Sequence, residues 1–379
     1  MSKSIEDVIR EKTQAIAAGE NRHCVGKVKR VQQYMLEVHG LEDAGYFERV
    51  TVGSVAEGYI ESIGRTSVVV ALTKLSGSVA VGDVVSATGK TYTARCSTDA
   101  VGHVVDMFAV DKLAGLEFDD SFDIPIQSPP IPIMDRTKVG RPLHTGIVGI
   151  DMLYPIGRGQ RQLIIGDKKT GKSQIVLDTI VNQRGKEVMC IYVAIGKTKK
   201  EVKEVYVNLL KQGAMDYTMI LAAFNDECPP VLKNLPYTAV SIAEHYMMQG
   251  VDVLVAIDDL KRHADVCREI ALLSGKVPGR DAYPPDIFYA HSSLLEKGCQ
   301  HKNGGSITIL PIVETKGGDI TDYISTNIIS ITDGQIVLST KNFLRGEKPA
   351  INYGLSVSRL GGAVQTKNIK ALGARVRRE

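Results

Sequence analysis

The pattern of hydrophobic and polar positions changes along the chain. Residues 4–18 place apolar side chains near helical spacing, which predicts a short amphipathic helix. This helix either packs on its own domain or docks onto another protein. Between residues 25 and 93, short apolar runs such as residues 68–72 and 83–87 alternate with glycine-rich turns. Short strands with frequent turns predict a small β-barrel or sandwich.

The second half of the chain has a different pattern. Residues 124–134 carry four prolines, which favour an extended path without helix. After residue 140, continuous apolar runs alternate with helical patterns, and we expect buried strands at residues 163–165, 188–194, 219–223 and 253–257. Continuous apolar strands alternating with helices indicate an α/β core with a parallel sheet covered on both faces.

A glycine-rich octapeptide follows the first of these strands and precedes a helical pattern at residues 174–181. It fits the P-loop spacing, and its residues are Gly166, Asp167, Lys168, Lys169, Thr170, Gly171, Lys172 and Ser173. Its glycines let the backbone wrap a phosphate with the N–H groups pointing inward. Lys172 then supplies charge for the terminal phosphates, and Ser173 a hydroxyl for Mg²⁺. We expect a site for ATP or ADP with Mg²⁺, and whether the chain hydrolyses the nucleotide is a separate question.

An apolar strand that ends in an acid supplies the second half of the expected site. Residues 253–257 lead directly into Asp258 and Asp259. A carboxylate at the end of such a strand holds Mg²⁺ beside a P-loop, so Asp258 is the candidate metal ligand together with Ser173. Asp259 is then expected to cap the following helix.

A group that activates water is not evident. In P-loop ATPases of the RecA type, a glutamate often follows the strand after the P-loop helix, but here that position is Lys197. Lysine with an ordinary pKa near 10 cannot accept a proton at pH 7, which favours binding without efficient turnover. Glu227 and Glu314 are the alternative bases if Lys197 is only a solvated loop residue.

Composition adds limits rather than a function. The chain has 379 residues, enough for two or three domains, and a net charge of +3, which implies no bulk nucleic-acid partner. No apolar run approaches the ~20 residues that span a bilayer, and no signal peptide is expected. Six cysteines without a Cys-x-x-Cys pair indicate a reduced, cytoplasmic compartment.

Four longer stretches carry a family resemblance. Residues 154–167, 278–284, 326–335 and 349–362 closely resemble the alpha subunits of F-type ATP synthases, within the rotary ATPase alpha/beta family. The resemblance is dense from about residue 140 to residue 372 and looser across the barrel region. It implies a RecA-like P-loop core preceded by a small β-barrel, in a hexamer where alpha and beta subunits alternate around a rotor shaft.

The resemblance also implies roles for individual residues. In this family beta carries most catalytic nucleotide, and alpha holds nucleotide that is not turned over. Beta has a catalytic glutamate and alpha a glutamine where this chain has Lys197. Arg359 matches the arginine finger that enters the neighbouring beta site, and Ser356 and Ser330 match interface positions near it. Phe343 and Pro349 match positions that pack against the adenine of alpha's own nucleotide.

Together the pattern and the resemblance predict five segments. These are a docking helix at residues 1–22, the β-barrel at 23–95, a linker and approach to the core at 96–145, the RecA-like domain at 146–365, and the start of a truncated helical domain at 366–379. Implied partners are a beta-type catalytic subunit, the central rotor shaft, and a peripheral stalk subunit at the N-terminal helix. The expected location is cytoplasmic, peripheral on the inner face of the cell membrane, without direct insertion.

Some residues depart from the family pattern, and two other functions stay open. Lys168 and Lys169 stand where the family usually has Arg-Gln, and Lys348, Ser293 and Lys297 replace arginines. These changes and the early C-terminus also suit a repurposed alpha-like paralogue in a specialised ATPase complex. A self-sufficient hexameric export ATPase or RNA translocase is a further alternative, although it calls for a carboxylate at position 197.

Overall fold

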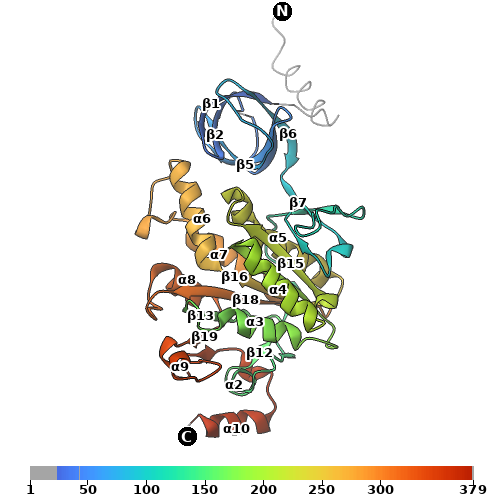
Figure 1. The fold of residues 1–379 in the computed structure, drawn as a ribbon, viewed down its shortest axis with the longest axis vertical. Helices are drawn as coiled ribbons and strands as arrows, with labels where there is room; N and C mark the ends of the chain where they lie inside the picture. The colour runs from blue at the N-terminus through green and yellow to red at the C-terminus, as the bar shows by residue number, and fades with distance from the viewer. Residues whose placement is uncertain (1–23, 42, 378–379) are drawn as a thin grey trace, which may run out of the picture. The chain divides into compact units, whose positions relative to one another are not determined.

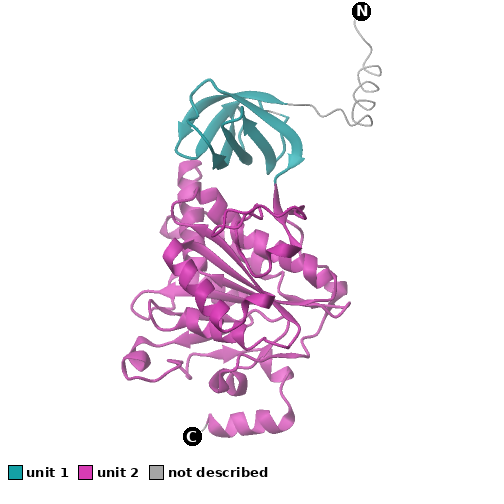
Figure 2. Ribbon diagram, turned by 45° about the vertical axis from the view of Figure 1, so that its right-hand side comes forward, with its two compact units in different colours: residues 1–92 teal, residues 93–379 magenta. Residues whose placement is uncertain are grey.

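The computed structural model describes residues 24–41 and 43–377, which divide into two compact units (Figures 1 and 2). Of the described residues, those up to residue 92 belong to the first unit and those from residue 93 onward to the second. The docking helix predicted at residues 1–22, which is expected to bind a peripheral stalk subunit, lies outside the described residues.

The first unit is a closed barrel, which decides between the barrel and the sandwich expected from the sequence. Its strands follow the order β1-β2-β5-β4-β3-β6 and pair antiparallel throughout. They are β1 (Val25–Gln32), β2 (Met35–His39), β3 (Glu48–Val52), β4 (Ala56–Ile63), β5 (Val68–Leu75) and β6 (Val84–Thr91). Closure pairs the edge strands with each other, so no edge of the barrel is left unpaired.

An aromatic cluster fills part of the barrel interior. The ring of Tyr59 lies 4.6 Å from that of Phe47 and 5.3 Å from that of Tyr92, measured between ring centroids. All three side chains are buried. They therefore serve the core and present no stacking surface of the kind that single-stranded nucleic-acid binders use.

The second unit is built on a sheet whose central strands are parallel, as the apolar runs predict. The order of these strands is β19-β13-β18-β16-β14-β15. They are β13 (Leu163–Asp167), β14 (Val188–Lys197), β15 (Thr218–Phe224), β16 (Asp252–Asp258), β18 (Ser306–Thr315) and β19 (Gly334–Leu338). Nearly every residue of β14, β15, β16 and β18 is buried, as a sheet covered on both faces requires.

Helices cover both faces of this sheet (Figure 1). On one face, α3 (Lys172–Val181) and α4 (Lys199–Lys211) share a hydrophobic cluster with alternate residues of β14, namely Cys190, Tyr192 and Ala194. On the other face lie α5 (Pro229–Met248), α6 (Leu260–Leu273), α7 (Ile287–Leu295) and α8 (Tyr323–Ile331), which pack on the sheet and on one another. The two-residue period of the strands thus supplies a separate core to each helical layer.

Residues 96–145, predicted as a linker and approach to the core, contain ordered strands. The strand β8 (Val104–Val105) pairs parallel with β15 and extends the main sheet, and β9 (Phe122–Pro125) pairs with β7 (Thr93–Cys96). Further short strands are β10 (Arg136–Thr137), β11 (Pro142–Leu143), β12 (Ile156–Gly157), β17 (Cys299–His301) and β20 (Val357–Ser358). Two-residue strands are too short to give a periodic signal, so the sequence pattern could not reveal β8.

Three further α-helices belong to the second unit. They are α2 (Val148–Leu153), α9 (Thr340–Leu344) and α10 (Lys367–Val376), and α10 packs against α2. Within residues 24–41 and 43–377, no helix combines the length and apolar composition that crossing a bilayer requires.

Candidate nucleotide site

The strand register gathers the predicted site residues at one edge of the sheet. Gly166 on β13 lies opposite Glu314 on β18, and Asp258 on β16 lies opposite Ala194 on β14. All these strands are parallel, so their carboxyl ends meet at the same edge. The P-loop after β13, the acid after β16 and Lys197 at the end of β14 therefore face a common region.

The P-loop has the backbone form that its glycines predict. Gly171 precedes α3 with φ of +97°, and Lys169 also has a positive φ, of +63°. The N–H groups of Thr170 and Gly171 have no acceptor among the described residues, which leaves them available to an anion. Free donors at a helix N-terminus favour binding of a phosphate. Lys168 and Lys169 are exposed.

Lys172 and Asp167 stabilise the loop from within. Lys172 is 7% exposed, and its Nζ donates a hydrogen bond of 2.6 Å to the carbonyl oxygen of Asp167. Burial lowers the pKa of Lys172, an effect that the carboxylates of Glu314 and Asp258 oppose. The Asp167 carboxylate accepts hydrogen bonds from Thr315, Gly318 and Thr340. It therefore anchors the loop to neighbouring segments rather than facing the phosphate position.

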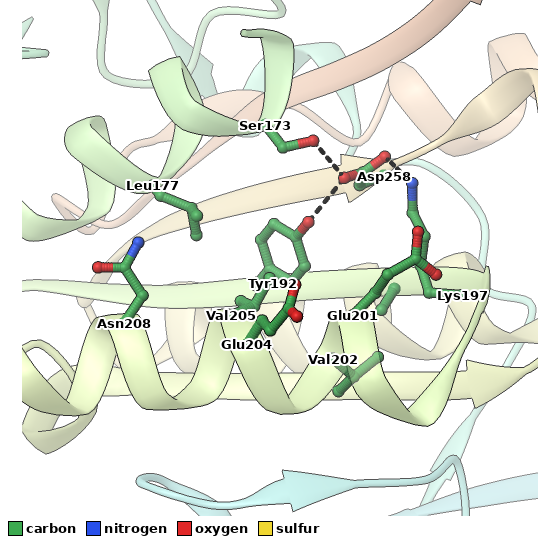
Figure 3. A pocket seen from close by; sticks show the side chains of 11 residues that line it. Ser173, Leu177, Tyr192, Lys197, Glu201, Val202, Glu204, Val205, Asn208 and Asp258 are labelled. Atoms are coloured by element: carbon green, nitrogen blue, oxygen red, sulfur yellow. Dashed lines mark hydrogen bonds and ion pairs between the residues drawn. The ribbon is translucent and has the colours of Figure 1, made fainter. Parts of the chain in front are cut away.

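Asp258 is the centre of a buried polar cluster, shown in Figure 3. The hydroxyls of Ser173 and Tyr192 donate to its Oδ2 over 2.8 and 2.7 Å. Nζ of Lys197 lies 2.7 Å from its Oδ1. The cluster borders a cavity of about 270 Å³ between β14, α3 and α4. Both carboxylate oxygens of Asp258 are thus engaged within the chain.

A bulge at the end of β14 positions Lys197. The pairing of β14 with β15 shifts register between Ile195 and Lys197, and Gly196 between them has φ of +61°. Burial disfavours the charged form of Lys197, but the carboxylates of Asp258, Asp259 and Glu201 together outweigh this effect and raise the pKa of the ammonium group. Lys197 is therefore a cation at neutral pH and cannot act as a general base.

The neighbouring acid, Asp259, caps α6 as predicted. Its carboxylate accepts a hydrogen bond of 2.6 Å from the backbone N–H of Arg262. Burial, followed by the negative charge of Asp258, raises the pKa of Asp259 to about 6. Capping the N-terminus of α6 is thus the structural role of Asp259.

A second cavity, of about 410 Å³, adjoins the P-loop. It brings Phe343 and Pro349 together with loop and α3 residues, and its lining is Ile147, Thr170, Gly171, Gln174, Ile175, Asp178, Phe343, Lys348, Pro349 and Ala350. Nζ of Lys348 lies 5.3 Å above the Phe343 ring. An apolar cavity with an aromatic face next to a phosphate cradle has the chemistry that an adenine base requires.

The residues proposed to act across an interface differ in their surroundings. Arg359 is exposed, and its guanidinium makes no ion pair or hydrogen bond with the part of the chain that the structure describes. Ser330 is exposed and donates to the carbonyl of Thr326. Ser356 is buried, and its hydroxyl donates to the carbonyl of Asn352 and accepts from the N–H of Val337.

The two alternative bases, Glu227 and Glu314, have different surroundings. Glu227 accepts a hydrogen bond from the N–H of Phe224 and pairs with Lys112, so its carboxylate is held by its own turn. Glu314 lies at the P-loop edge, where it acts electrostatically on Lys172. Only Glu314 is placed beside the phosphate position by the sheet register.

Sequence reasoning missed two features of the site. The sequence showed that Lys197 stands where a catalytic base is expected, but not that Lys197 pairs with Asp258. The importance of Tyr192 was also not recognised. A tyrosine within an otherwise apolar strand was the available signal, because a buried phenol requires a hydrogen-bond acceptor.

Comparison with known proteins agrees with this geometry. Residues 146–358 match the model of the ATP synthase alpha/beta family, nucleotide-binding domain. The chain is 43% identical to an ATP synthase subunit alpha of Caldanaerobacter subterraneus. The match covers 100% of this chain and 75% of the length of that relative. The chain is 45% and 41% identical to ATP synthase subunits alpha of Acholeplasma laidlawii and Clostridium acetobutylicum, over 93% of this chain and 71% of each relative. The chain therefore belongs to the ATP synthase alpha/beta family, where it groups with the alpha subunits.

Proposed function

We propose that this chain is a regulatory, non-catalytic alpha subunit of an ion-translocating ATP synthase. It holds ATP or ADP at its P-loop and lends Arg359 to the catalytic site of an adjacent beta-type subunit. The observation that carries the proposal is the ion pair of Lys197 with Asp258, because it places a cation where hydrolysis needs a base.

The nucleotide is held by the residues around the two cavities. The P-loop backbone receives the phosphates, Lys172 neutralises them, and the cavity with Phe343 and Pro349 takes the base. Ser173 and Asp258 are the residues that would contact a Mg²⁺ ion arriving with the nucleotide, since a hydroxyl and a carboxylate are oxygen donors of the kind this ion prefers, but Lys197 already pairs with that carboxylate. When bound, the ion would neutralise phosphate charge.

Arg359 is proposed to act on a partner rather than on this chain's own nucleotide. Its guanidinium is exposed and has no partner within residues 24–41 and 43–377, so it is available to a neighbouring subunit. A guanidinium stabilises the charge that develops on a transferring phosphoryl group. Ser356 and Ser330 would contribute to the interface near the same catalytic site.

The proposed assembly follows from the resemblance to F-type alpha subunits. Alpha-type and beta-type subunits would alternate around a central rotor shaft, with a peripheral stalk subunit at the N-terminal segment. The complex would lie on the inner face of the cell membrane and use a proton or sodium gradient. The chain itself would contact neither nucleic acid nor the lipid interior.

Substitution of Arg359 tests this proposal in the assembled complex. We expect Arg359→Ala to reduce the ATPase activity of a complex with a beta-type subunit by about a hundredfold or more, as is typical for arginine fingers. Assembly and the amount of nucleotide bound to this chain should not change. Arg345→Ala, which removes another exposed arginine of the same unit, is the matched control. Full activity of the Arg359→Ala complex would remove Arg359 from this role.

A further inference from the structure

The ammonium group of Lys197 forms an ion pair with the Asp258 carboxylate, the group expected to bind Mg²⁺. Its Nζ lies 2.7 Å from Oδ1 of Asp258, whose side chain is 4% exposed, and the Lys197 side chain is 26% exposed. This is an internal ion pair rather than a surface contact. Charges that are largely removed from water interact more strongly than exposed ones.

Asp258 has little remaining capacity for a metal. Its Oδ2 already accepts hydrogen bonds from Ser173 and Tyr192, in addition to the contact of Oδ1 with Lys197. Among the described residues, no group of three histidine, cysteine or acidic side chains gathers into a metal site. A metal at this edge would therefore depend on one carboxylate, one hydroxyl, the nucleotide and water.

The electrostatic consequence follows from what Mg²⁺ does in a P-loop site. The ion separates the negative phosphates from the negative acid, and without it the acid repels the nucleotide. Lys197 neutralises Asp258 at neutral pH, and Lys172 adds a second ammonium group at the loop, where Glu314 and Asp259 contribute further negative charge. A bound Mg²⁺ would in turn be repelled by Lys197. Both effects reduce the benefit that the ion brings to nucleotide binding.

We propose that Lys197 replaces Mg²⁺ as the counter-charge of Asp258, so that this site binds metal-free nucleotide about as tightly as the Mg²⁺ complex. This inference rests on the proposed nucleotide binding and deepens it. It concerns the form of the nucleotide that the site selects.

The test is a comparison of ATP affinity in EDTA and in excess Mg²⁺, measured by calorimetry on the full chain. We expect the two dissociation constants to agree within about threefold for the parent chain. In Lys197→Gln the acid is no longer neutralised, and we expect affinity in EDTA to fall about tenfold or more below that with Mg²⁺. Titration with Mn²⁺, followed by its paramagnetic resonance, should show tighter binding of the ion to the ATP-loaded Lys197→Gln chain than to the parent.

Two further variants serve as controls, one for charge and one for position. Lys197→Arg keeps the charge and should keep the parent's ratio of affinities. Lys200→Gln removes a lysine three residues away whose side chain is 86% exposed, and it should also behave as the parent. Thermal unfolding of each variant confirms that it is folded, and if Lys197→Gln is not, the parent and Lys197→Arg still carry the test.

The outcomes separate this inference from the function on which it rests. A parent chain that loses tenfold or more in affinity when Mg²⁺ is removed would overturn the inference and leave nucleotide binding intact. An unchanged ratio in folded Lys197→Gln would overturn it as well. A parent chain that binds ATP in neither buffer would contradict the proposed function itself.

Discussion

Lys197 lies at the end of the strand that follows the P-loop helix, with its Nζ 2.7 Å from Oδ1 of Asp258. This ion pair affects both the position expected to supply a catalytic base and the acid expected to hold a metal. The position that would supply a base supplies a cation, and the acid that would hold a metal is already neutralised. A site built in this way is suited to holding a nucleotide, and it lacks the arrangement that turnover requires.

Substitution of Lys172 and of Lys168 compares what a buried and an exposed lysine of the P-loop contribute to ATP affinity. Lys172 is buried against the loop and Lys168 is exposed. We expect Lys172→Ala to lower ATP affinity by about a hundredfold, because a largely desolvated ammonium group contributes several kcal/mol to phosphate binding. Lys168→Ala should stay within about threefold of the parent, since the backbone forms the cradle at that position. Calorimetry measures both, and similar losses in the two variants would contradict this assignment.

Phe343 is expected to contact the base and not the phosphates. Replacing it with alanine removes the aromatic face of the 410 Å³ cavity. Stacking contributes about 1–3 kcal/mol per base, so ATP affinity should fall by about tenfold. Affinity for inorganic tripolyphosphate, which has no base, should not change. An equal loss for both ligands would show that Phe343 acts on the loop instead.

The segment that presents Arg359 depends on a small residue at position 361. A methyl group on Gly361 would overlap the carbonyl oxygen of Pro155, to which Ser358 also donates a hydrogen bond. We expect Gly361→Ala to lower the free energy of unfolding by about 1–3 kcal/mol through overpacking. Because the segment must shift, activity of the complex should also fall, while ATP binding by this chain stays as in the parent. Parent-like activity would show that Arg359 tolerates this displacement.

Acid should destabilise the second unit through a buried histidine pair. Burial lowers the pKa of His263 from 6.5 to about 4, and its Nδ1 lies 3.2 Å from Nε2 of the equally buried His291. Burial also lowers the pKa of His291. The unfolded chain therefore binds more protons below pH 6.5, and stability falls as the pH decreases from 6.5 to 4. For His263 alone the loss is on the order of 3 kcal/mol.

Urea unfolding at several pH values measures this effect. His263→Gln retains a donor for the carbonyl of Lys233, which His263 contacts in the folded chain. Its free energy of unfolding should depend less on pH between 6.5 and 4 than that of the parent. A parallel pH dependence in the two chains would assign the acid sensitivity to other groups.

The sequence predicted the parts of the fold that have strong periodicity. The buried strands β13, β14, β15 and β16 and the cap at Asp259 appear where the apolar runs placed them. It did not predict β8, because two residues carry no period, and a parallel partner distant in the sequence decides that they form a strand.

The site was predictable in its components and not in their contacts. The P-loop has a fixed spacing, and Asp258 follows an apolar strand, so both are visible in the sequence. The contact of Lys197 with Asp258 depends on the register of β14 with β16 and on the bulge at Gly196. These are tertiary relationships between residues of similar local pattern, and no local propensity encodes them.

The most direct test of the account asks whether this chain's own site turns ATP over. The complex would be assembled with a beta-type subunit whose own P-loop lysine is replaced, so that this chain carries the intact P-loops. We predict that ATP binds to these sites and is recovered as ATP, with no hydrolysis above that of the Lys172→Ala complex. Hydrolysis at an ordinary enzymatic rate that is lost in Lys172→Ala, and also in Glu314→Gln, would contradict the account and identify Glu314 as the base.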